Sequence, residues 1–206
     1  MPVSQRQRMG AASREAILDA AERLMAAHGF TGASISRIER ASGLPASSIY
    51  WHFGSKDGVL LAVMQRGADR FFASLPHAAD FSGTPVERIR AGLATAALLL
   101  EEHPQFLQLL ITLGLQHTDD TKVLALVRET RQRARERLEE AIAAALEDLP
   151  DDERGAVSAE LAHFALALAD GAFVARQIDE GVDLESTFGQ LATVLGAMVA
   201  TRAPAP

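Results

Sequence analysis

Three side chains that could contact a nucleic acid are adjacent in the sequence. They are Tyr50, Trp51 and His52, in the segment GLPASSIYWHFGSKDGVL at residues 43–60, and this tyrosine and tryptophan are the only ones in 206 residues. A phenol and an imidazole can donate hydrogen bonds to phosphate oxygens, and an indole can contact a sugar or the methyl group of thymine. Their concentration on one short stretch therefore indicates a surface that contacts DNA.

Lys56 adds a cation at the start of the next predicted helix. Ser55 is placed to cap that helix, so Lys56 lies in its first turn, where the helix dipole disfavours a positive charge by ~0.3–1 kcal/mol. A bound phosphate would reverse this cost, because backbone N–H groups and the ammonium group would face it together. The simpler interpretation is an ordinary exposed lysine beside Asp57.

The elements that must position these side chains have the pattern of a helix-turn-helix. A first helix is expected over residues 13–29. Ser34 is expected to cap a short second helix, Gly43 to end it with a positive φ, and Pro45 to begin a third helix that ends at Gly54. In a helix-turn-helix the second helix of the pair enters the major groove of DNA.

The segment GFTGASISRIERASGLPASSIYWHFGSKDGVL resembles the DNA-binding segment of the TetR (tetracycline-repressor-like) transcriptional regulators. The resemblance covers about the first quarter of the chain and rests on Gly-Phe at 29–30, Ser-Ile-Ser-Arg-Ile at 34–38, Ile-Tyr-Trp-His-Phe at 49–53 and Ser-Lys-Asp at 55–57. It implies a set of residues that hold phosphates or lie near base edges. These residues are Ser34, Pro45, Ala46, Ser47, Ser48, Tyr50, Trp51, His52 and Lys56.

Three positions depart from that family pattern. Glu39 and Ser42 stand where alanine is usual, and Pro45 stands where a capping serine is usual. We expect the Glu39 carboxylate to point outward past the two short helices, or to pair with Arg37 or Arg40. These departures bear on how the two helices cross and leave the motif intact.

The rest of the chain predicts an all-α protein with about nine helices. Apolar residues make up 48% of the sequence and aromatic residues only 5%, and no strand pattern exceeds three residues. We expect two domains, an N-terminal arm with the helix-turn-helix DNA-binding domain at 1–54 and a helical ligand-binding and dimerisation domain at 55–206. The later helices are expected at about 55–75, 85–102, 104–117, 120–149, 152–180 and 184–202.

The last two predicted helices carry apolar or small residues around most of their surface, which suggests a second partner. The resemblance implies a two-fold homodimer built from these helices, which would bind a near-palindrome. The interface is expected to include Phe164, Leu168, Gly171, Ala172, Leu191, Leu195 and Met198.

The resemblance also implies a pocket for a small-molecule effector among the middle helices. Each candidate taken singly is better explained as plain core, although a pocket somewhere among them is expected. The candidates are Met64, Phe71, His103, Phe106, Leu110, His117 and Phe164.

The net charge of −7 is unevenly distributed along the chain. Residues 1–72 hold nine Lys or Arg and six Asp or Glu, whereas residues 73–206 hold eleven and twenty-one. A basic N-terminal part is compatible with DNA binding, and equally with chance. The resemblance implies an N-terminal arm in which Arg6 and Arg8 reach an adjacent minor groove.

Composition also predicts the compartment. The sequence has no cysteine, which excludes disulfides and thiolate metal sites and suits a reducing cytoplasm. The stretch MPVSQRQRMG lacks the apolar core of a signal peptide, and the apolar stretches are too short or too interrupted for a membrane span. We therefore expect a cytoplasmic protein with no membrane partner.

An enzyme is the competing class. Glu160 and His163 have the Glu-x-x-His spacing of helical di-iron sites, but such a site needs a second copy of the motif and two further glutamates. The sequence holds no second copy, no Ser-His-Asp set and no Gly-rich phosphate loop. We expect no catalytic residue, no metal and no cofactor.

The expected function is a DNA-binding transcriptional regulator. Its simplest form is a repressor that binds a palindromic operator as a homodimer and is released by a small, mostly apolar ligand. Two other functions remain open, a ligand-independent architectural DNA-binding protein and an activator.

Overall fold

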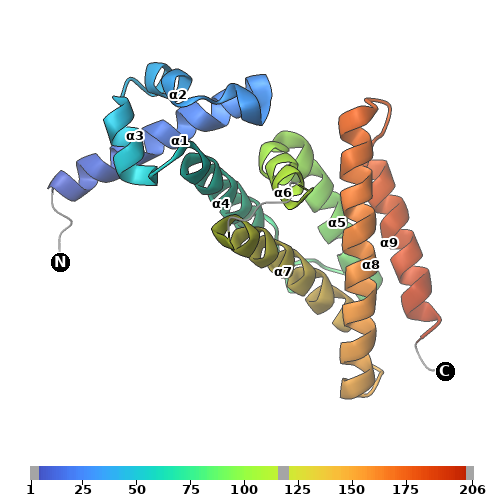
Figure 1. The fold of residues 1–206 in the computed structure, drawn as a ribbon. Coiled ribbons are helices and arrows are strands. Elements are labelled where there is room, and N and C mark those ends of the chain that lie inside the picture. Colours follow the sequence, from blue (N-terminus) through green and yellow to red (C-terminus); the bar gives the residue numbers. More distant parts are fainter. Residues whose placement is uncertain (1–4, 116–120, 203–206) are drawn as a thin grey trace. The chain divides into compact units, whose positions relative to one another are not determined.

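The computed structural model describes residues 5–115 and 121–202. Within them the chain forms nine α-helices and one short 3-10 helix, and no strand (Figure 1), which confirms the predicted all-α class. The first four helices are α1 (Gln5–Gly32), α2 (Ile35–Ser42), α3 (Ala46–Phe53) and α4 (Lys56–Ser74). The later elements are η1 (Ala78–Asp80), α5 (Pro85–Glu102), α6 (Gln105–Leu115), α7 (Thr121–Ala143), α8 (Asp151–Ile178) and α9 (Leu184–Ala200).

The helices belong to two compact units, and each is described by itself. The first contains α1, α2 and α3, α4 as far as Arg70, α6, and α7 as far as Val127. The second contains the end of α4, η1, α5, the rest of α7, α8 and α9. The functional boundary expected between residues 54 and 55 stays a prediction.

The core of the first unit forms where α1, α2 and α3 pack together. Ile17 and Leu18 on α1, Ile38 on α2 and Ile49 on α3 are each fully buried. Because the two short helices bury only one large side chain each, most of their remaining surface is free to contact something else.

Two predicted helix boundaries are wrong. Helix α1 begins at Gln5, and the hydroxyl of Ser13 donates to the carbonyl of Met9 at 2.9 Å instead of capping a helix start. Residues 5–12 are mostly good helix formers, so the helix continues N-terminally past the serine. Helix α7 ends at Ala143, and the chain beyond it tightens into i→i+3 hydrogen bonds, including the one from the Ala145 N–H to the Ile142 carbonyl at 2.9 Å.

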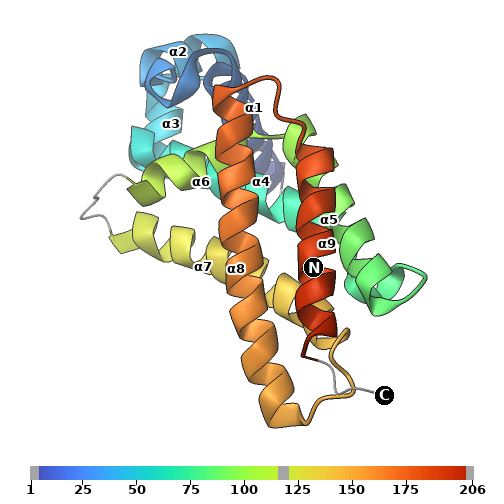
Figure 2. The ribbon, with the colours of Figure 1, turned by 90° about the vertical axis from the view of Figure 1, so that its right-hand side faces the viewer.

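In the second unit α9 packs against α5 and α8 (Figure 2). Gly196 permits the close approach of α5, because a Cβ at this position would lie 2.9 Å from Cγ1 of Val86. Helix α5 begins with a capping box, in which Thr84 and Glu87 satisfy each other's backbone N–H groups. A short ion pair between Arg131 and Asp170 joins α7 to α8.

Candidate nucleic-acid interface

The turn between α2 and α3 is built by local contacts that the sequence predicted. The Oγ of Ser34 accepts the N–H of Arg37 at 3.3 Å and so caps α2. Gly43 ends α2 with φ 71° and ψ 11°, a left-handed conformation that other residues adopt at a cost. Gly54 ends α3 with φ 74°. The structure therefore confirms the caps and breaks that define the helix-turn-helix.

Helix α3 presents an exposed aromatic and polar face. Its buried side is Ile49, whereas Tyr50 is 52% exposed and Trp51 is 78% exposed. The Trp51 and His52 rings meet edge to face with their centroids 4.5 Å apart, which holds the indole beside the imidazole. Helix α3 therefore exposes two adjacent large aromatic side chains, those of Tyr50 and Trp51.

The remaining predicted DNA contacts lie at the starts of α2, α3 and α4. Pro45 is the N-cap of α3, Ser34 is the N-cap of α2 and Lys56 is the first residue of α4. Each of the nine predicted contacts keeps exposed or half-buried surface, including Ala46, Ser47 and Ser48 in the first turn of α3.

The corner between α3 and α4 depends on a glycine that the sequence analysis did not single out. The Oγ of Ser55 accepts the N–H of Gly58 at 3.0 Å, as the predicted cap requires. A Cβ at Gly58 would lie 2.0 Å from the carbonyl oxygen of Phe53, at the end of α3. Any side chain at residue 58 would therefore push the two helices apart. In the sequence, the signal for this close contact was a glycine in the first turn of a helix.

The sequence predicted that the Glu39 carboxylate would point outward or pair with an arginine, and this prediction is wrong. Its Oε1 accepts the backbone N–H of Ala46, the first residue of α3, at 3.0 Å. The guanidinium of Arg37 donates to the Gly32 carbonyl at 3.1 Å instead. The carboxylate thus lies inside the helix-turn-helix, between its two helices.

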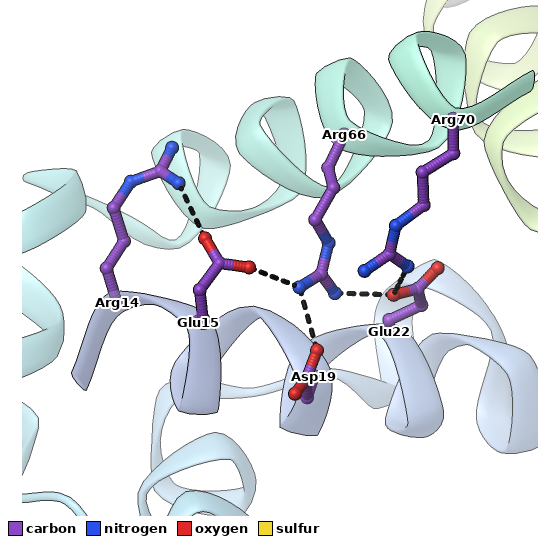
Figure 3. Close-up of polar contacts among 6 residues, drawn as sticks. All are labelled: Arg14, Glu15, Asp19, Glu22, Arg66 and Arg70. Carbon is purple, nitrogen blue, oxygen red and sulfur yellow. Dashed lines mark hydrogen bonds and ion pairs between the residues drawn. The ribbon is translucent and has the colours of Figure 1, made fainter. Parts of the chain in front are cut away.

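One arginine on α4 gathers three carboxylates from α1 (Figure 3). Arg66 contacts Glu15 at 3.1 Å, Asp19 at 2.7 Å and Glu22 in a very short ion pair, and its side chain is only 11% exposed. Arg70 adds a contact to Glu22 at 3.3 Å. Burial lowers the pKa of Arg66, but the surrounding carboxylates, Glu22 foremost, raise it to a net value above the ordinary one.

This Arg66 cluster holds α4 against α1, and α1 is the helix on which the two short helices of the helix-turn-helix pack. The carboxylates recur at i, i+4 and i+7 on one stripe of α1, which was a visible signal. Their partner lies 44 residues or more along the chain, so the sequence did not identify it. Arg14 completes the support, because its guanidinium lies over the Phe53 ring at 5.4 Å. The predicted arm residues Arg6 and Arg8 belong to α1.

The candidate ligand residues fall into both units. Met64, Phe106 and Leu110 are buried in the first, where Gly67 allows Phe106 to approach α4 so closely that a Cβ on the glycine would lie 2.4 Å from it. In the second unit Phe71 is half-buried, and His103 and Phe164 are exposed. His117 lies outside the described residues.

The candidate dimer residues also divide into two groups. Phe164 and Leu168 on α8 are 39% and 42% exposed, Gly171 is exposed, and Ala172 and Met198 are half-buried. By contrast, Leu191 and Leu195 on α9 are 5% and 0% exposed, because they pack inside their own chain. Their apolar stripe is thus accounted for within one chain. The large apolar side chains that remain exposed on these two helices are Phe164, Leu168, Val174, Ile178 and Val194.

Helix α8 is long and apolar enough to cross a membrane by length and composition, with a mean hydropathy of 1.4 over an 18-residue window, of which 28% is buried. It also carries Asp170 and Glu160 in ion pairs with Arg131 and Arg202. Among residues 5–115 and 121–202, no group of three potential metal ligands occurs. Helix α8 is therefore apolar over much of its length, with two of its acidic residues held in ion pairs.

A helix-turn-helix followed in the chain by longer helices is typical of a class of DNA-binding regulators. Residues 17–63 match the family described as bacterial regulatory proteins of the tetR family. Over 112 residues the chain is 32% identical to the uncharacterized HTH-type transcriptional regulator TtgW of Pseudomonas putida, a match that covers 52% of this chain and 78% of TtgW. The chain therefore belongs to the tetR family, a family of regulators rather than enzymes.

Other relatives support this assignment over different lengths. The HTH-type transcriptional repressor AcnR of Corynebacterium glutamicum is 41% identical over 58 residues, which are 28% of this chain and 31% of AcnR. SmeT, the repressor of the Stenotrophomonas maltophilia multidrug efflux pump SmeDEF, is 26% identical with a TM-score of 0.65, covering 91% of this chain and 88% of SmeT. A transcriptional regulator from Rhodococcus sp. RHA1 has the same fold, with 18% identity and a TM-score of 0.73 over 94% of this chain and all of that one.

Proposed function

We propose that the protein is a cytoplasmic repressor that binds a palindromic operator as a homodimer and is released by a small, mostly apolar ligand. The observation that carries the DNA-binding part is the exposed face of α3, with Trp51 78% exposed and Tyr50 52% exposed over a buried Ile49. An indole and a phenol exposed in this way add little to folding and suit a groove lined with thymine methyls and phosphates.

Six of the nine predicted contacts have a proposed chemical role on DNA. Ser34 and Lys56 lie at the N-termini of α2 and α4, where backbone N–H groups and the helix dipole favour a phosphate. Tyr50 and His52 donate to the phosphate backbone. Ser47 and Trp51 lie nearest the base edges, so they carry sequence preference, whereas the phosphate contacts set the orientation of the helix.

The proposed dimer rests on the exposed apolar surface of the last two helices. Phe164 and Leu168 on α8 and Val194 on α9 are large apolar side chains between 39% and 44% exposed. A second copy related by a two-fold axis presents the same surface and covers both at once. Two copies of α3 related by that axis would then contact inverted half-sites one helical turn of DNA apart, ~34–36 Å, or a multiple of it.

Selection of bound DNA from a random pool tests the proposed function. The wild-type protein should enrich inverted half-sites, with a Kd on the order of 10⁻⁸–10⁻¹¹ M at moderate salt. Trp51→Ala should relax the preference at one position of each half-site and leave the others, because one contact is lost from a retained fold. A pool without inverted half-sites would refute the proposal, and salt-dependent binding with no motif would favour an architectural protein.

The ligand part of the proposal draws on SmeT, of which a complex with triclosan is known. We expect an apolar phenol of this kind, or another hydrophobic metabolite, to raise the melting temperature of this protein and weaken its operator binding. A coupling free energy of ~1–3 kcal/mol corresponds to roughly 5–150-fold release. Thermal-shift screening followed by DNA-release assays measures both effects. Compounds that stabilise the protein yet leave operator affinity unchanged would contradict the coupling.

A further inference from the structure

The N-terminus of α3 has no cap of its own. The N-cap residue is Pro45, and it makes no side-chain hydrogen bond to the helix. The Pro45 carbonyl accepts the N–H of Ser48 at 2.8 Å, which closes the first turn, but the amide of Ala46 has no acceptor within α3. An N-cap Ser, Thr, Asp or Asn side chain accepts from the second or third amide of a helix, so the first amide needs an acceptor from elsewhere.

Glu39 supplies the acceptor from the other helix. Its Oε1 accepts the Ala46 N–H at 3.0 Å across seven residues of sequence, in a half-buried environment. Its backbone carbonyl accepts the N–H of Gly43 at 3.0 Å and the hydroxyl of Ser42 at 3.3 Å. One residue therefore holds the end of α2, the glycine turn and the beginning of α3.

We propose that Glu39 is a positioning residue for DNA recognition, and that its carboxylate holds the first amide of α3, a helix whose N-cap residue offers no side-chain acceptor. This inference rests on the proposed DNA-binding function. The first turn of α3 carries Ser47 and leads into Trp51, so the orientation of that turn decides which base edges the two side chains meet. A carboxylate at a helix N-terminus is also favourable toward the helix dipole.

The negative charge of Glu39 weakens binding to any DNA, whereas the hydrogen bond that its carboxylate accepts from α3 favours binding to the correct sequence. A carboxylate beside a phosphate-facing helix repels any DNA, whatever its sequence. A hydrogen bond that orients α3 matters only where base edges must be matched. Removal of the side chain should therefore weaken binding to the operator without weakening binding to unrelated DNA, which a purely structural residue would not do.

The test compares three variants by amide hydrogen exchange and by binding to the selected operator and to a scrambled duplex. In Glu39→Ala the Ala46 amide should exchange about five- to tenfold faster, the operator Kd should rise by a similar factor, and the Kd for scrambled DNA should stay equal or fall. Glu39→Gln retains an acceptor oxygen and should keep most of the protection and the specificity. Adding Pro45→Ser to Glu39→Ala should recover part of the operator affinity and leave the Ala46 amide exchanging fast, because a serine N-cap accepts the N–H of Ser47 or Ser48 and not that of Ala46.

A matched control removes one negative charge without touching the cap. Asp57→Asn, at the exposed first turn of α4, should tighten both complexes by similar factors and leave their ratio unchanged. Unchanged exchange of Ala46 in Glu39→Ala would overturn the cap, and faster exchange with an unchanged operator-to-scrambled ratio would overturn the positioning role. If wild-type protein selects no operator, the proposed function fails, whereas the exchange of Ala46 still reports on the cap.

Discussion

Replacement of Arg66 by methionine is expected to lower the free energy of unfolding by about 2–4 kcal/mol at neutral pH. The Arg66 side chain is 11% exposed and contacts Glu15, Asp19 and Glu22. Removing one partner of a buried ion pair costs about 3–5 kcal/mol, and here the carboxylates are more exposed than in that case. The variant also leaves Asp19 without its cation, and Glu15 and Glu22 with only the more exposed Arg14 and Arg70. Urea unfolding followed by circular dichroism measures the difference.

Arg70→Met is the matched control for this prediction. Arg70 is 58% exposed and contacts only Glu22 of the same three carboxylates, so its loss should cost at most about 1 kcal/mol. Substituting Glu15→Gln and Asp19→Asn in the Arg66→Met background should restore part of the lost stability, because the uncompensated charges are removed. Equal destabilisation by the two arginine variants would contradict the role assigned to Arg66.

The pH dependence of this contribution has a definite sign. The carboxylates raise the pKa of Arg66 more than burial lowers it, so the folded state holds its proton more tightly than the unfolded chain. The stabilisation is therefore fully present below the ordinary pKa of arginine and is lost only as the pH rises through the raised value. We expect the difference between wild type and Arg66→Met not to fall from pH 6 to pH 9 through any titration of the guanidinium.

A single charge on the outer face of α8 is expected to abolish the proposed dimer. Leu168→Glu introduces a carboxylate that the two-fold axis would bury twice, at several kcal/mol for each unpaired charge. The protein should remain folded, because Leu168 is 42% exposed in one chain, but sediment as a monomer. Operator affinity should fall at least about 100-fold, since one half-site then binds without the other.

Leu98→Glu controls for the charge itself. Leu98 lies on α5 and is 50% exposed, so the same substitution is made at similar exposure on another helix. This variant should remain dimeric with unchanged operator affinity. Wild-type protein that sediments as a monomer at micromolar concentration would end the dimer proposal. Leu195 is unsuited to the test, because it is fully buried in its own chain and a charge there would unfold the protein.

The features predicted correctly from sequence are those with local causes. The cap at Ser34, the positive φ of Gly43 and the cap at Ser55 each depend on residues within a few positions, and the structure confirms all three. The family pattern added the chemical meaning of Tyr50 and Trp51. An eight-residue helix with one buried isoleucine cannot hide those two rings, so their exposure followed directly.

The contacts that sequence missed join residues far apart or have more than one possible partner. The acidic stripe of α1 was visible, but nothing local indicated that Arg66 would meet it 44 residues later. Glu39 has two arginines nearby in the sequence, so an ion pair was the simpler prediction. The sequence pattern did not indicate that the Ala46 amide, next to a proline without a capping side chain, would be its partner. The stripe at Leu191 and Leu195 predicted burial correctly, but an amphipathic pattern does not say whether the covering helix belongs to the same chain.

The Arg66 cluster has a consequence for hybrid regulators, in which the DNA-binding part of one protein is joined to the effector part of another. A junction at residue 54 would follow the helix-turn-helix boundary and yet separate Arg66 from Glu15, Asp19 and Glu22. A donor α4 without an arginine at that position would leave the acidic stripe of α1 unmatched. The exchangeable part of this chain therefore extends through the first four turns of α4, to Arg70. A graft with this boundary retains the ion pairs that hold α4 against α1.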